Sequence, residues 1–542
     1  MSSSKRTLDA DLPTQKKRKR SIKAALTHNL KDIQTKRFDF VANIFSKELV
    51  LKVFSYLSPR DLRQCAAVSY RWSVMANDEM LWKPLFYKRF HTPRIKYRIP
   101  QTDLLKDNYH LNSQRRAETV SKYRGSWKLK YKVHRNWLLG HCQISDIIFQ
   151  AVNQNNSSHF RHVQVYNNML LTNRNNSPTV EVWKYMAHIN GSTATLVYQF
   201  KADDIKDNTR ITQFKLFTQQ EVKKKILVAG YSNGGFTLWE IANKGAGCED
   251  LSKENIIELF TYVKSVCGRT NNDVSAVSLE YPILTVHAYD TISIYHIESA
   301  TVKLIRQFRC PYDWKSVALN VFPCKTVFGN RPNNLWKIVI CFVIAAGNSY
   351  PATVGIQELL VSENDIVSSK QSLDVQSYPL STDFAYSLLP TNRTSFTMVT
   401  SIAYSPPHLI TAYDNNTIEK YMVTPTSPSS EISRLHIHKQ NILYGHTYKV
   451  EAIAIDALRQ KLISADRSCI KIWNLHDSLL KQSALVPSDI PVTIPIFDNL
   501  SAMMELPFCK VEKLDFNEDK IVAIIGSPLE DTSSIRLWSF HT

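Results

Sequence analysis

The feature that most constrains the fold is a strand-like segment that recurs seven times between residues 180 and 540. Apolar and polar residues alternate within each copy, and every copy except the fourth has Trp or Tyr at its fourth position, which suits a half-buried β-strand. The copies are VEVWKY (180–185), FTLWEI (236–241), ISIYHI (292–297), TVGIQEL (353–359), IEKYMV (418–423), IKIWNL (470–475) and IRLWSF (535–540). Neighbouring copies lie 52 to 65 residues apart, and this recurrence predicts a repeat architecture.

These segments resemble the third strand of WD repeats, whose blades each contain four antiparallel strands. The clearest copy contains Trp473 and is preceded by Gly445-His446. The resemblance implies an all-β propeller over residues 126–542, and the seven copies lead us to expect seven blades. In the WD family a buried Asp six residues before the Trp braces the adjacent turn. Here Arg467 holds that position, and Asp466 comes one residue earlier.

The propeller is expected to be closed by a strand from the amino-terminal side. Only four residues follow Trp538, so the last repeat has no outer strand of its own. The segment Leu129 to Leu138 (LKYKVHRNWL) precedes the first copy, and we expect it to supply that strand. Such a closure joins the two ends of the ring and leaves no open sheet edge.

Residues 38–90 show a helical period instead. Apolar side chains recur three or four residues apart, which predicts an amphipathic helix ended by Ser58-Pro59, followed by two shorter helices. The apolar positions of the first helix are Phe45, Leu49, Val53, Phe54 and Leu57. A span of this size buries too small a core to hide all its large apolar side chains, so some are expected to contact a partner.

The order of residues in this span resembles the F-box. The family's usual leading Leu-Pro is Phe45-Ser46 here, and its usual Val-Cys is Val68-Ser69. The resemblance implies docking onto the SKP-type adaptor of a cullin–RING ubiquitin ligase. The matching adaptor-binding positions are Phe45, Leu49, Val53, Phe54, Leu57, Leu62, Val68 and Trp72. The alternative is a three-helix cap that packs on the larger domain.

The net charge of +19 is concentrated in the first quarter of the chain. Residues 1–135 hold 31 basic and 11 acidic residues, whereas the remainder holds 36 and 37. Residues 1–37 are read as a disordered basic tail, and residues 91–125 as a linker. Two basic clusters in the tail resemble a bipartite nuclear localisation signal for a nuclear import receptor: Lys5, Arg6, Lys16, Lys17, Arg18, Lys19 and Arg20. A solvated tail, or one that touches nucleic acid, remains the alternative.

The sequence offers no pattern for catalysis or for a cofactor. Gly230 to Gly234 matches G-x-S-x-G, but a strand pattern follows it where a nucleophile elbow requires a helix. The nine cysteines include no C-x-x-C pair, so neither a metal site nor a disulfide framework is indicated. His436 and His438 would share one face of a strand, and surface histidines are the commoner interpretation. No apolar run is long enough to span a membrane.

The turns between second and third strands are the expected docking end for a target protein. They contain two bases, Arg174 and Arg467, as low-ranked candidates for target binding. The acids at these turns are Asp290, Asp414, Asp466, Glu530 and Asp531. Because acids outnumber bases, we expect that a phosphate at this end does not select the target, although Arg269 and Arg309 in longer connections could change the balance.

Together the two resemblances indicate an F-box/WD-repeat protein. They imply a non-enzymatic substrate receptor of a cullin–RING (SCF-type) ligase. We expect it in the nucleus, with the cytoplasm as a second location. The helical module would hold the ligase and the propeller the target. Two alternatives are an F-box protein that acts outside any ligase and a nucleic-acid-associated nuclear scaffold. The near-neutral charge of residues 136–542 argues against the scaffold. The identity of the target cannot be read from the sequence.

Overall fold

The structure is a computed structural model. It describes Asp39, Val41 and residues 45–91, 126–149, 159–188, 191–202, 209–219, 224–241, 256–262, 272–298, 301–310, 314–328, 331–344, 353–374, 398–425, 435–457, 459–475, 490–497, 509–527 and 532–541. The basic tail and nearly all of the expected linker lie outside these residues. The chain divides into two compact units. The first consists of Met1–Lys96 and Gly125–Tyr131, and the second of Tyr97–Arg124 and Lys132–Thr542.

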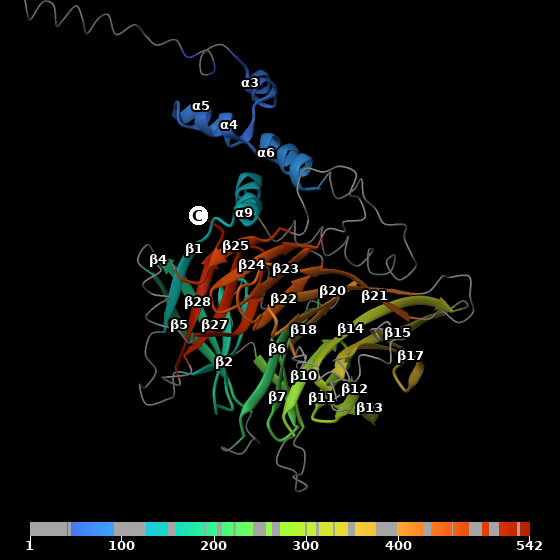
Figure 1. Cartoon of the computed structure of the whole chain (residues 1–542). Helices are drawn as coiled ribbons and strands as arrows, with labels where there is room; N and C mark the ends of the chain where they lie inside the picture. Colours follow the sequence, from blue (N-terminus) through green and yellow to red (C-terminus); the bar gives the residue numbers. More distant parts are fainter. Residues whose placement is uncertain are drawn as a thin grey trace, which may run out of the picture. The chain divides into compact units, whose positions relative to one another are not determined.

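The first unit contains the helical module (Figure 1). Its elements are α3 (Lys47–Phe54), α4 (Pro59–Ala66), α5 (Tyr70–Ala76), α6 (Glu79–Phe86) and the short π-helix η1 (Tyr87–His91). Each of these four α-helices begins at a polar cap whose side chain accepts a backbone N–H: Ser46, Ser58, Ser69 or Asp78. At α4 the cap is a reciprocal capping box between Ser58 and Asp61, with Pro59 at the first helical position.

The core of this unit needs residues from beyond position 90. Phe54, Leu62 and Trp82 are buried together, and Tyr131 from helix α9 (Trp127–Leu139) joins them with its ring centroid 5.5 Å from that of Trp82. The Trp127 N–H donates to the Glu79 carboxylate at 2.7 Å. The first turns of α9 therefore complete the small core, which residues 38–90 alone would leave open.

The second unit contains 28 described strands. They are β1 (Gln143–Phe149), β2 (Phe160–Tyr166), β3 (Met169–Arg174), β4 (Val180–His188), β5 (Gly191–Phe200), β6 (Ile211–Gln219), β7 (Lys224–Tyr231), β8 (Phe236–Ile241), β9 (Ile256–Tyr262), β10 (Val274–Glu280), β11 (Ile283–Ala288), β12 (Thr291–Ile297), β13 (Val302–Arg309) and β14 (Trp314–Phe328). The others are β15 (Arg331–Ile344), β16 (Thr353–Val361), β17 (Ile366–Asp374), β18 (Val399–Ser405), β19 (His408–Tyr413), β20 (Ile418–Pro425), β21 (Leu435–Leu443), β22 (Ala452–Asp456), β23 (Lys461–Ala465), β24 (Cys469–Asn474), β25 (Val492–Pro495), β26 (Lys510–Phe516), β27 (Lys520–Ser527) and β28 (Thr532–Ser539).

These strands form a β-propeller, but the prediction of seven separate blades is wrong. Five sheets have four strands each, and one sheet has eight, in the order β2-β3-β4-β5-β1-β28-β27-β26. The first strands of successive four-strand groups contact one another around the ring, and β26 returns to β2. Every recurring segment found in the sequence lies in the third strand of its group, as expected: β4, β8, β12, β16, β20, β24 and β28.

The closing strand comes from a different segment than the one predicted. Leu129 to Leu138 lies in helix α9, whereas β1 pairs with β28 in antiparallel register from Gln143–Ser539 to Asp146–Arg536. The Arg536 guanidinium donates to both Asp146 carboxylate oxygens, at 2.6 and 2.7 Å. Strand β1 also pairs with β5 in parallel register, which merges the first and last groups into the eight-stranded sheet.

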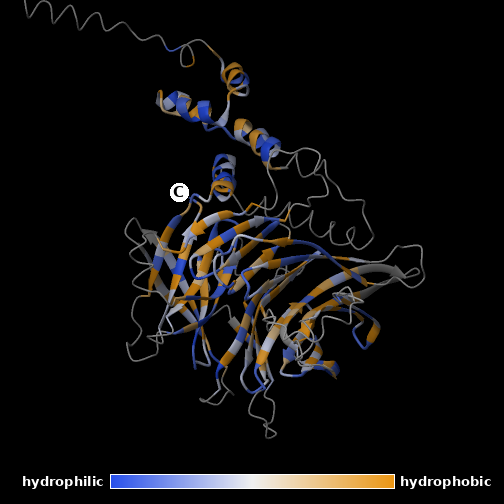
Figure 2. Cartoon of the chain, viewed as in Figure 1, coloured by the Kyte–Doolittle hydropathy of each residue, from blue (hydrophilic) through white to orange (hydrophobic). Residues whose placement is uncertain are grey.

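The propeller core lies between adjacent sheets and includes the aromatic side chains of the third strands. Trp183, Trp473, Trp538 and Tyr421 are among the largest fully buried side chains. Apolar residues recur along the strands between polar ones (Figure 2). Burial does not alternate in the same way, because strands such as β3, β11 and β19 are buried at nearly every position. No helix in the described part of the chain is long and apolar enough to cross a membrane.

Candidate functional site

Half of the predicted adaptor-binding residues lie on the surface of the helical module. The exposed fractions of Phe45, Leu49, Val53 and Val68 are 47%, 56%, 58% and 63%. Leu49 and Val53 lie four residues apart and therefore share one face of α3, and Phe45 precedes Leu49 by the same spacing just before the helix begins. Large apolar side chains exposed together on so small a unit are typical of a surface that a partner covers.

The other half lies in or against the core. Phe54 and Leu62 are 3% and 1% exposed, and Leu57 and Trp72 are partly buried against the same cluster. The interpretation of Phe54 and Leu62 as contact residues is therefore corrected: their side chains hold the helices together and are not available to a partner. Five residues separate Leu49 from Phe54, which places them on different sides of a helix with 3.6 residues per turn.

Four exposed apolar residues of the described module were not predicted. They are Tyr56, Tyr70, Val74 and Met80, and Tyr70 is 84% exposed. The signal for Tyr56 was present in the sequence, because it extends the series of Phe45, Leu49 and Val53 by a further three residues. We use the name exposed apolar face for the set of these eight exposed side chains, which come from α3, α5, α6 and the turns beside them: Phe45, Leu49, Val53, Tyr56, Val68, Tyr70, Val74 and Met80.

Polar contacts fix the helices that carry this face. The Lys47 ammonium group lies 3.3 Å from the Asp78 carboxylate, which links the start of α3 to the cap of α6. The Trp72 indole N–H donates to the Asp39 carboxylate at 2.9 Å, and the Phe54 and Trp72 ring centroids lie 5.5 Å apart. These contacts set the position of α3 against α5.

The candidate target-binding bases of the propeller already have partners. The Arg174 Nε–H donates to both Glu181 carboxylate oxygens, at 3.1 and 3.2 Å, and its guanidinium lies over the Phe160 ring. The Arg467 guanidinium lies 3.7 Å from the centre of the Tyr448 ring. Arg174 is therefore neutralised within its own sheet, whereas the role of Arg467 in target binding stays a prediction.

The charge count at these turns also changes. Asp466 is fully buried, Asp290 lies 4.0 Å from Arg309, and Asp414 accepts the Met398 N–H at 2.9 Å. The remaining two acids of the count, at positions 530 and 531, lie outside the described residues. Of the three described acids, Asp466 is therefore not accessible to a target and Asp290 is partly balanced by Arg309, whereas Asp414 keeps its negative charge.

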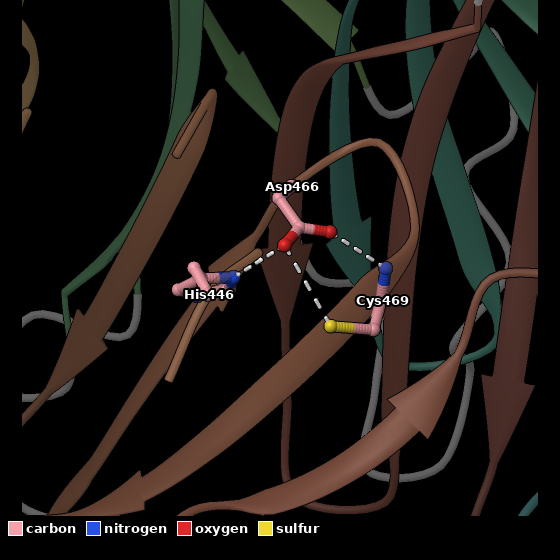
Figure 3. A group of neighbouring side chains, drawn as sticks. All are labelled: His446, Asp466 and Cys469. Atoms are coloured by element: carbon pink, nitrogen blue, oxygen red, sulfur yellow. Dashed lines mark hydrogen bonds and ion pairs between the residues drawn. The ribbon is translucent and has the colours of Figure 1, made fainter. Parts of the chain in front are cut away.

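Asp466 braces the turn that in the WD family is braced by an Asp one residue later, at the position that Arg467 holds here. Its carboxylate lies 2.9 Å from His446 Nδ1 and accepts the Cys469 N–H at 2.8 Å (Figure 3). It also accepts the Ser468 N–H and hydroxyl at 2.7 Å each. Burial alone would raise the pKa of Asp466, but the hydrogen bonds from His446, Ser468 and Cys469 outweigh it and hold the pKa well below its usual value.

The brace continues to the buried tryptophan. His446 Nε2 lies 2.7 Å from Ser464 Oγ, and the Trp473 indole N–H donates to the same oxygen at 2.8 Å. By donor type, His446, Asp466 and Cys469 could hold a metal ion, since their ligand atoms lie within 4.8 Å of one another. Because the Asp466 oxygens and both His446 ring nitrogens already have hydrogen-bond partners, the arrangement fits a structural network.

Two other sequence features are placed by the structure. Ser232 of the G-x-S-x-G match lies in the turn between β7 and β8, a strand–turn–strand hairpin and not a strand-to-helix elbow. His436 and His438 lie on β21 with their ring centroids 5.7 Å apart. The predicted nuclear localisation residues, Lys5, Arg6, Lys16, Lys17, Arg18, Lys19 and Arg20, lie outside the described residues.

Comparison with known proteins identifies both parts of the chain. Residues 47–88 match the family described as F-box-like, and residues 142–490 match the family described as F-box protein pof12 beta-propeller. The first match covers α3 to α6. The second covers more than half of the chain and most of the propeller strands.

Individual relatives share shorter stretches. An F-box protein of Saccharomyces cerevisiae is 26% identical over 134 residues, which is 23% of this chain and 20% of that protein. The F-box/WD repeat-containing protein 8 of Rattus norvegicus is 42% identical over 50 residues, 9% of this chain and 8% of that protein. The F-box protein dre-1 of Caenorhabditis elegans is 40% identical over 58 residues, 11% and 6% of the respective chains. The matches thus span a fifth or less of each relative.

The family match over residues 142–490 agrees with the propeller, and the match over residues 47–88 agrees with the helical module. The chain therefore belongs to the F-box protein pof12 beta-propeller family and carries an F-box-like domain ahead of its propeller.

Proposed function

We propose that this protein is the substrate-recognition subunit of a cullin–RING (SCF-type) ubiquitin ligase. The F-box would bind the SKP-type adaptor, and the propeller would bind the target protein. The observation that carries the proposal is the exposed apolar face of the module, which includes four of the residues predicted from the F-box resemblance to bind the adaptor: Phe45, Leu49, Val53 and Val68. The last three lie within the F-box-like match over residues 47–88. The chain itself would supply no catalytic group.

The mechanism would be proximity. A target held by the propeller and a ligase held by the F-box on the same chain meet at a high effective concentration. Orienting a target lysine near the ubiquitin-loaded carrier then turns an encounter between separate molecules into a step within one assembly. This role requires both binding surfaces to be intact on one chain.

The adaptor surface is tested by a pull-down with purified full-length protein and a SKP-type adaptor. The Leu49→Ala/Val53→Ala double variant should lose most adaptor binding, because two adjacent anchors of an interface commonly contribute about 2 kcal/mol or more each. Its matched control is Leu304→Ala/Val367→Ala, which removes an exposed Leu and an exposed Val from outer strands of the propeller. Equal binding by both variants would contradict the assignment.

A role outside a ligase is distinguished by what co-purifies from cells with the proteasome blocked. A ligase receptor should recover the adaptor, a cullin and ubiquitinated target together. Recovery of the adaptor without a cullin would favour the F-box protein that acts outside a ligase. The Leu49→Ala/Val53→Ala variant is the control, since it should lose adaptor and cullin but keep the target.

We further propose a nuclear location, based on the two basic clusters of the tail. Their residues are Lys5, Arg6, Lys16, Lys17, Arg18, Lys19 and Arg20. An import receptor grips such clusters through acidic side chains, so alanine at positions 16–20 should move the protein to the cytoplasm in cell imaging. Lys303→Ala/Arg306→Ala, which changes exposed bases of β13, should leave the distribution unchanged.

We also propose to count the eight-stranded sheet as two blades. Its halves, β2-β3-β4-β5 and β1-β28-β27-β26, each have four strands like the other sheets, and they are joined by the parallel pairing of β1 with β5 over three residue pairs. On this proposal the five four-stranded sheets and the two halves of the eight-stranded sheet are repeats of one unit, although the two halves do not form separate sheets. The proposed domain limits are 38–90 for the F-box and 126–542 for the propeller, although the first turns of α9, up to Tyr131, belong to the compact unit of the F-box.

A further inference from the structure

The inner strands β22, β26 and β2 begin next to one another at one end of the propeller. The Val511 N–H at the start of β26 donates to the Glu451 carboxylate just before β22, at 2.6 Å. His159 Nε2, just before β2, lies 3.6 Å from the Glu512 carboxylate on β26. These contacts bring together side chains from the first and the last repeats of the propeller.

Basic side chains gather at these strand beginnings. Lys449 precedes β22, Lys510 and Lys513 lie on β26, and Arg161 is the second residue of β2. In the part of the chain that the structure describes, none of these four side chains forms a hydrogen bond or an ion pair within 4 Å. The three lysines are exposed and Arg161 is partly exposed. We call these four residues the basic strip.

The acidic groups at the same end are held by the protein itself. Glu451 accepts the backbone N–H described above, Glu512 lies against His159, and Asp273 lies 3.3 Å from Arg210 at the start of β6. These three carboxylates keep their negative charge and partly offset the strip: Asp273 and Glu512 act on Arg161, Glu512 acts on Lys513, and Glu451 interacts with Lys449 and Lys510. Because the four bases of the strip and Arg210 face these three acids, an excess of positive charge remains at this end.

The members of the strip lie close enough to repel one another. Burial lowers the pKa of Arg161, and the positive charge of Arg210 lowers it further. Burial also lowers the pKa of Lys513, followed by the effect of Arg161. The Lys513 side chain itself is exposed, so the part of this shift that bears on the strip is the positive charge of Arg161. An anionic ligand there would relieve the repulsion between the cations.

We propose that the basic strip binds an acidic peptide segment of the target protein, whose carboxylates pair with Lys449, Lys510, Lys513 and Arg161. This inference rests on the proposed function of the propeller as the target-binding domain. The same end of the propeller has aromatic side chains that could contact the peptide residues between the peptide's acids. Tyr444 is 65% exposed, and the Tyr448 ring stacks with the Arg467 guanidinium. Tyr and Arg are residue types that often anchor protein interfaces.

The experiment measures fluorescence anisotropy of labelled peptides with purified full-length protein. The probe is a peptide of about twelve residues in which Glu alternates with Ser or Leu, and its partner has Gln in place of every Glu. The Glu peptide should bind at least about tenfold more tightly than the Gln peptide, and its affinity should fall as salt screens the exposed cations. Equal affinity of the two peptides would overturn the proposal.

Variants locate the site. Lys510→Ala/Lys513→Ala should weaken binding of the Glu peptide about tenfold, and Lys449→Ala alone about threefold, since exposed ion pairs are individually weak and the losses of two of them multiply. The control Lys303→Ala/Arg306→Ala removes two exposed bases from outer strand β13 and should bind as the unchanged protein does. Equal weakening by control and test variants would overturn the proposal.

Two further probes separate carboxylates from other anions. A Gln peptide with one phosphoserine that binds where the Glu peptide does not would overturn the carboxylate assignment in favour of phosphate. A single-stranded oligonucleotide that binds more tightly than the Glu peptide, and loses affinity in the same variants, would overturn the assignment to peptide. Adaptor pull-down with the same variants should be unchanged, so failure of the strip is distinguishable from failure of the F-box.

Discussion

The indole ring of Trp137 stacks on the phenyl ring of Phe540, with ring centroids 3.8 Å apart and planes inclined by 14°. Around this pair, Asn136 Nδ2 donates to the Phe540 carbonyl at 2.9 Å and the Trp137 indole N–H donates to the Glu518 carbonyl at 2.8 Å. The second half of α9 is thereby fixed to the last strands of the propeller. A segment expected to close the propeller as a strand contacts it as a helix instead.

We expect Trp137→Ala to lower the free energy of unfolding of the propeller by about 3–5 kcal/mol, because it removes a buried indole and leaves a cavity against Phe540. Urea unfolding followed by circular dichroism measures the change. The control is Leu138→Ala at the next position, where the side chain is 51% exposed and the expected loss is about 0.5 kcal/mol or less. Similar losses in both variants would contradict the packing described here.

Substitution of Phe54 and of Leu49 by alanine should have different effects on the stability of the F-box. Phe54→Ala empties a site in the core of the F-box and should destabilise it by about 3–5 kcal/mol, whereas Leu49→Ala should leave the fold intact. Hydrogen exchange of the full-length protein measures the difference: the amides of α3 to α5 should exchange faster only in Phe54→Ala. Faster exchange in Leu49→Ala would show that Leu49 supports the fold and is not only part of a partner surface.

The third strands were predictable because their signal is local. Alternation and a recurring aromatic residue depend on the strand alone, and Trp183, Trp473 and Trp538 are buried as the pattern requires. The segment Leu129 to Leu138 shows the limit of such reasoning. Its apolar residues fit both a period of two and a helical period, and short segments of this kind do not decide between the two. The tertiary contacts of Tyr131 and Trp137 stabilise the helical conformation of this segment.

For the site, the sequence pattern named the right helices but not the direction of each side chain. Leu49 and Phe54 both fit the F-box pattern, but Leu49 is exposed and Phe54 is buried. The difference follows from their positions on the helix, where five residues at about 100° each place the two side chains about 140° apart. The basic strip could not be found from the turns alone. Arg161 and Lys513 become neighbours only because the last inner strand returns to the first.

Asp466→Asn should reduce the pH dependence of the propeller's free energy of unfolding in the acidic range. The hydrogen bonds to His446, Ser468 and Cys469 hold the pKa of Asp466 below its value in the unfolded chain. The stability that this carboxylate contributes is therefore fully present above the unfolded pKa of about 3.9 and is lost as pH falls from there toward the folded pKa. At pH 7 the Asn variant should be less stable by about 1–3 kcal/mol.

The measurement for Asp466 is urea unfolding at intervals between about pH 7 and pH 3. The gap between the unchanged protein and Asp466→Asn should be constant down to about pH 5 and narrow below about pH 4. The control is Asp365→Asn, in an exposed turn where the carboxylate accepts one backbone N–H. A gap that widens on acidification would contradict a charged, hydrogen-bonded Asp466.

In the blade formed by β18 to β21, a buried carboxylate takes the place of the hydroxyl that braces Trp473. Glu419 accepts the Tyr413 hydroxyl at 2.7 Å and also accepts the Tyr421 hydroxyl and the Lys439 ammonium group. Tyr421 stands at the position that Trp occupies in other repeats and is fully buried. Three donors thus converge on one carboxylate, which has enough lone pairs to accept them all.

We expect Glu419→Gln to destabilise the propeller by about 2–4 kcal/mol, although the side chain keeps its size. An amide has one acceptor oxygen and turns an N–H₂ group toward either the tyrosine hydroxyls or Lys439, so at least one of the three donors loses its partner and the charge that balances Lys439 is removed. The control is Glu298→Gln, where the side chain is 55% exposed, a contact to His296 at 3.9 Å is lost and about 1 kcal/mol or less is expected. Urea unfolding of both variants at pH 7 gives the comparison. A loss in Glu419→Gln no larger than in Glu298→Gln would mean that the cluster fills space without bracing the blade.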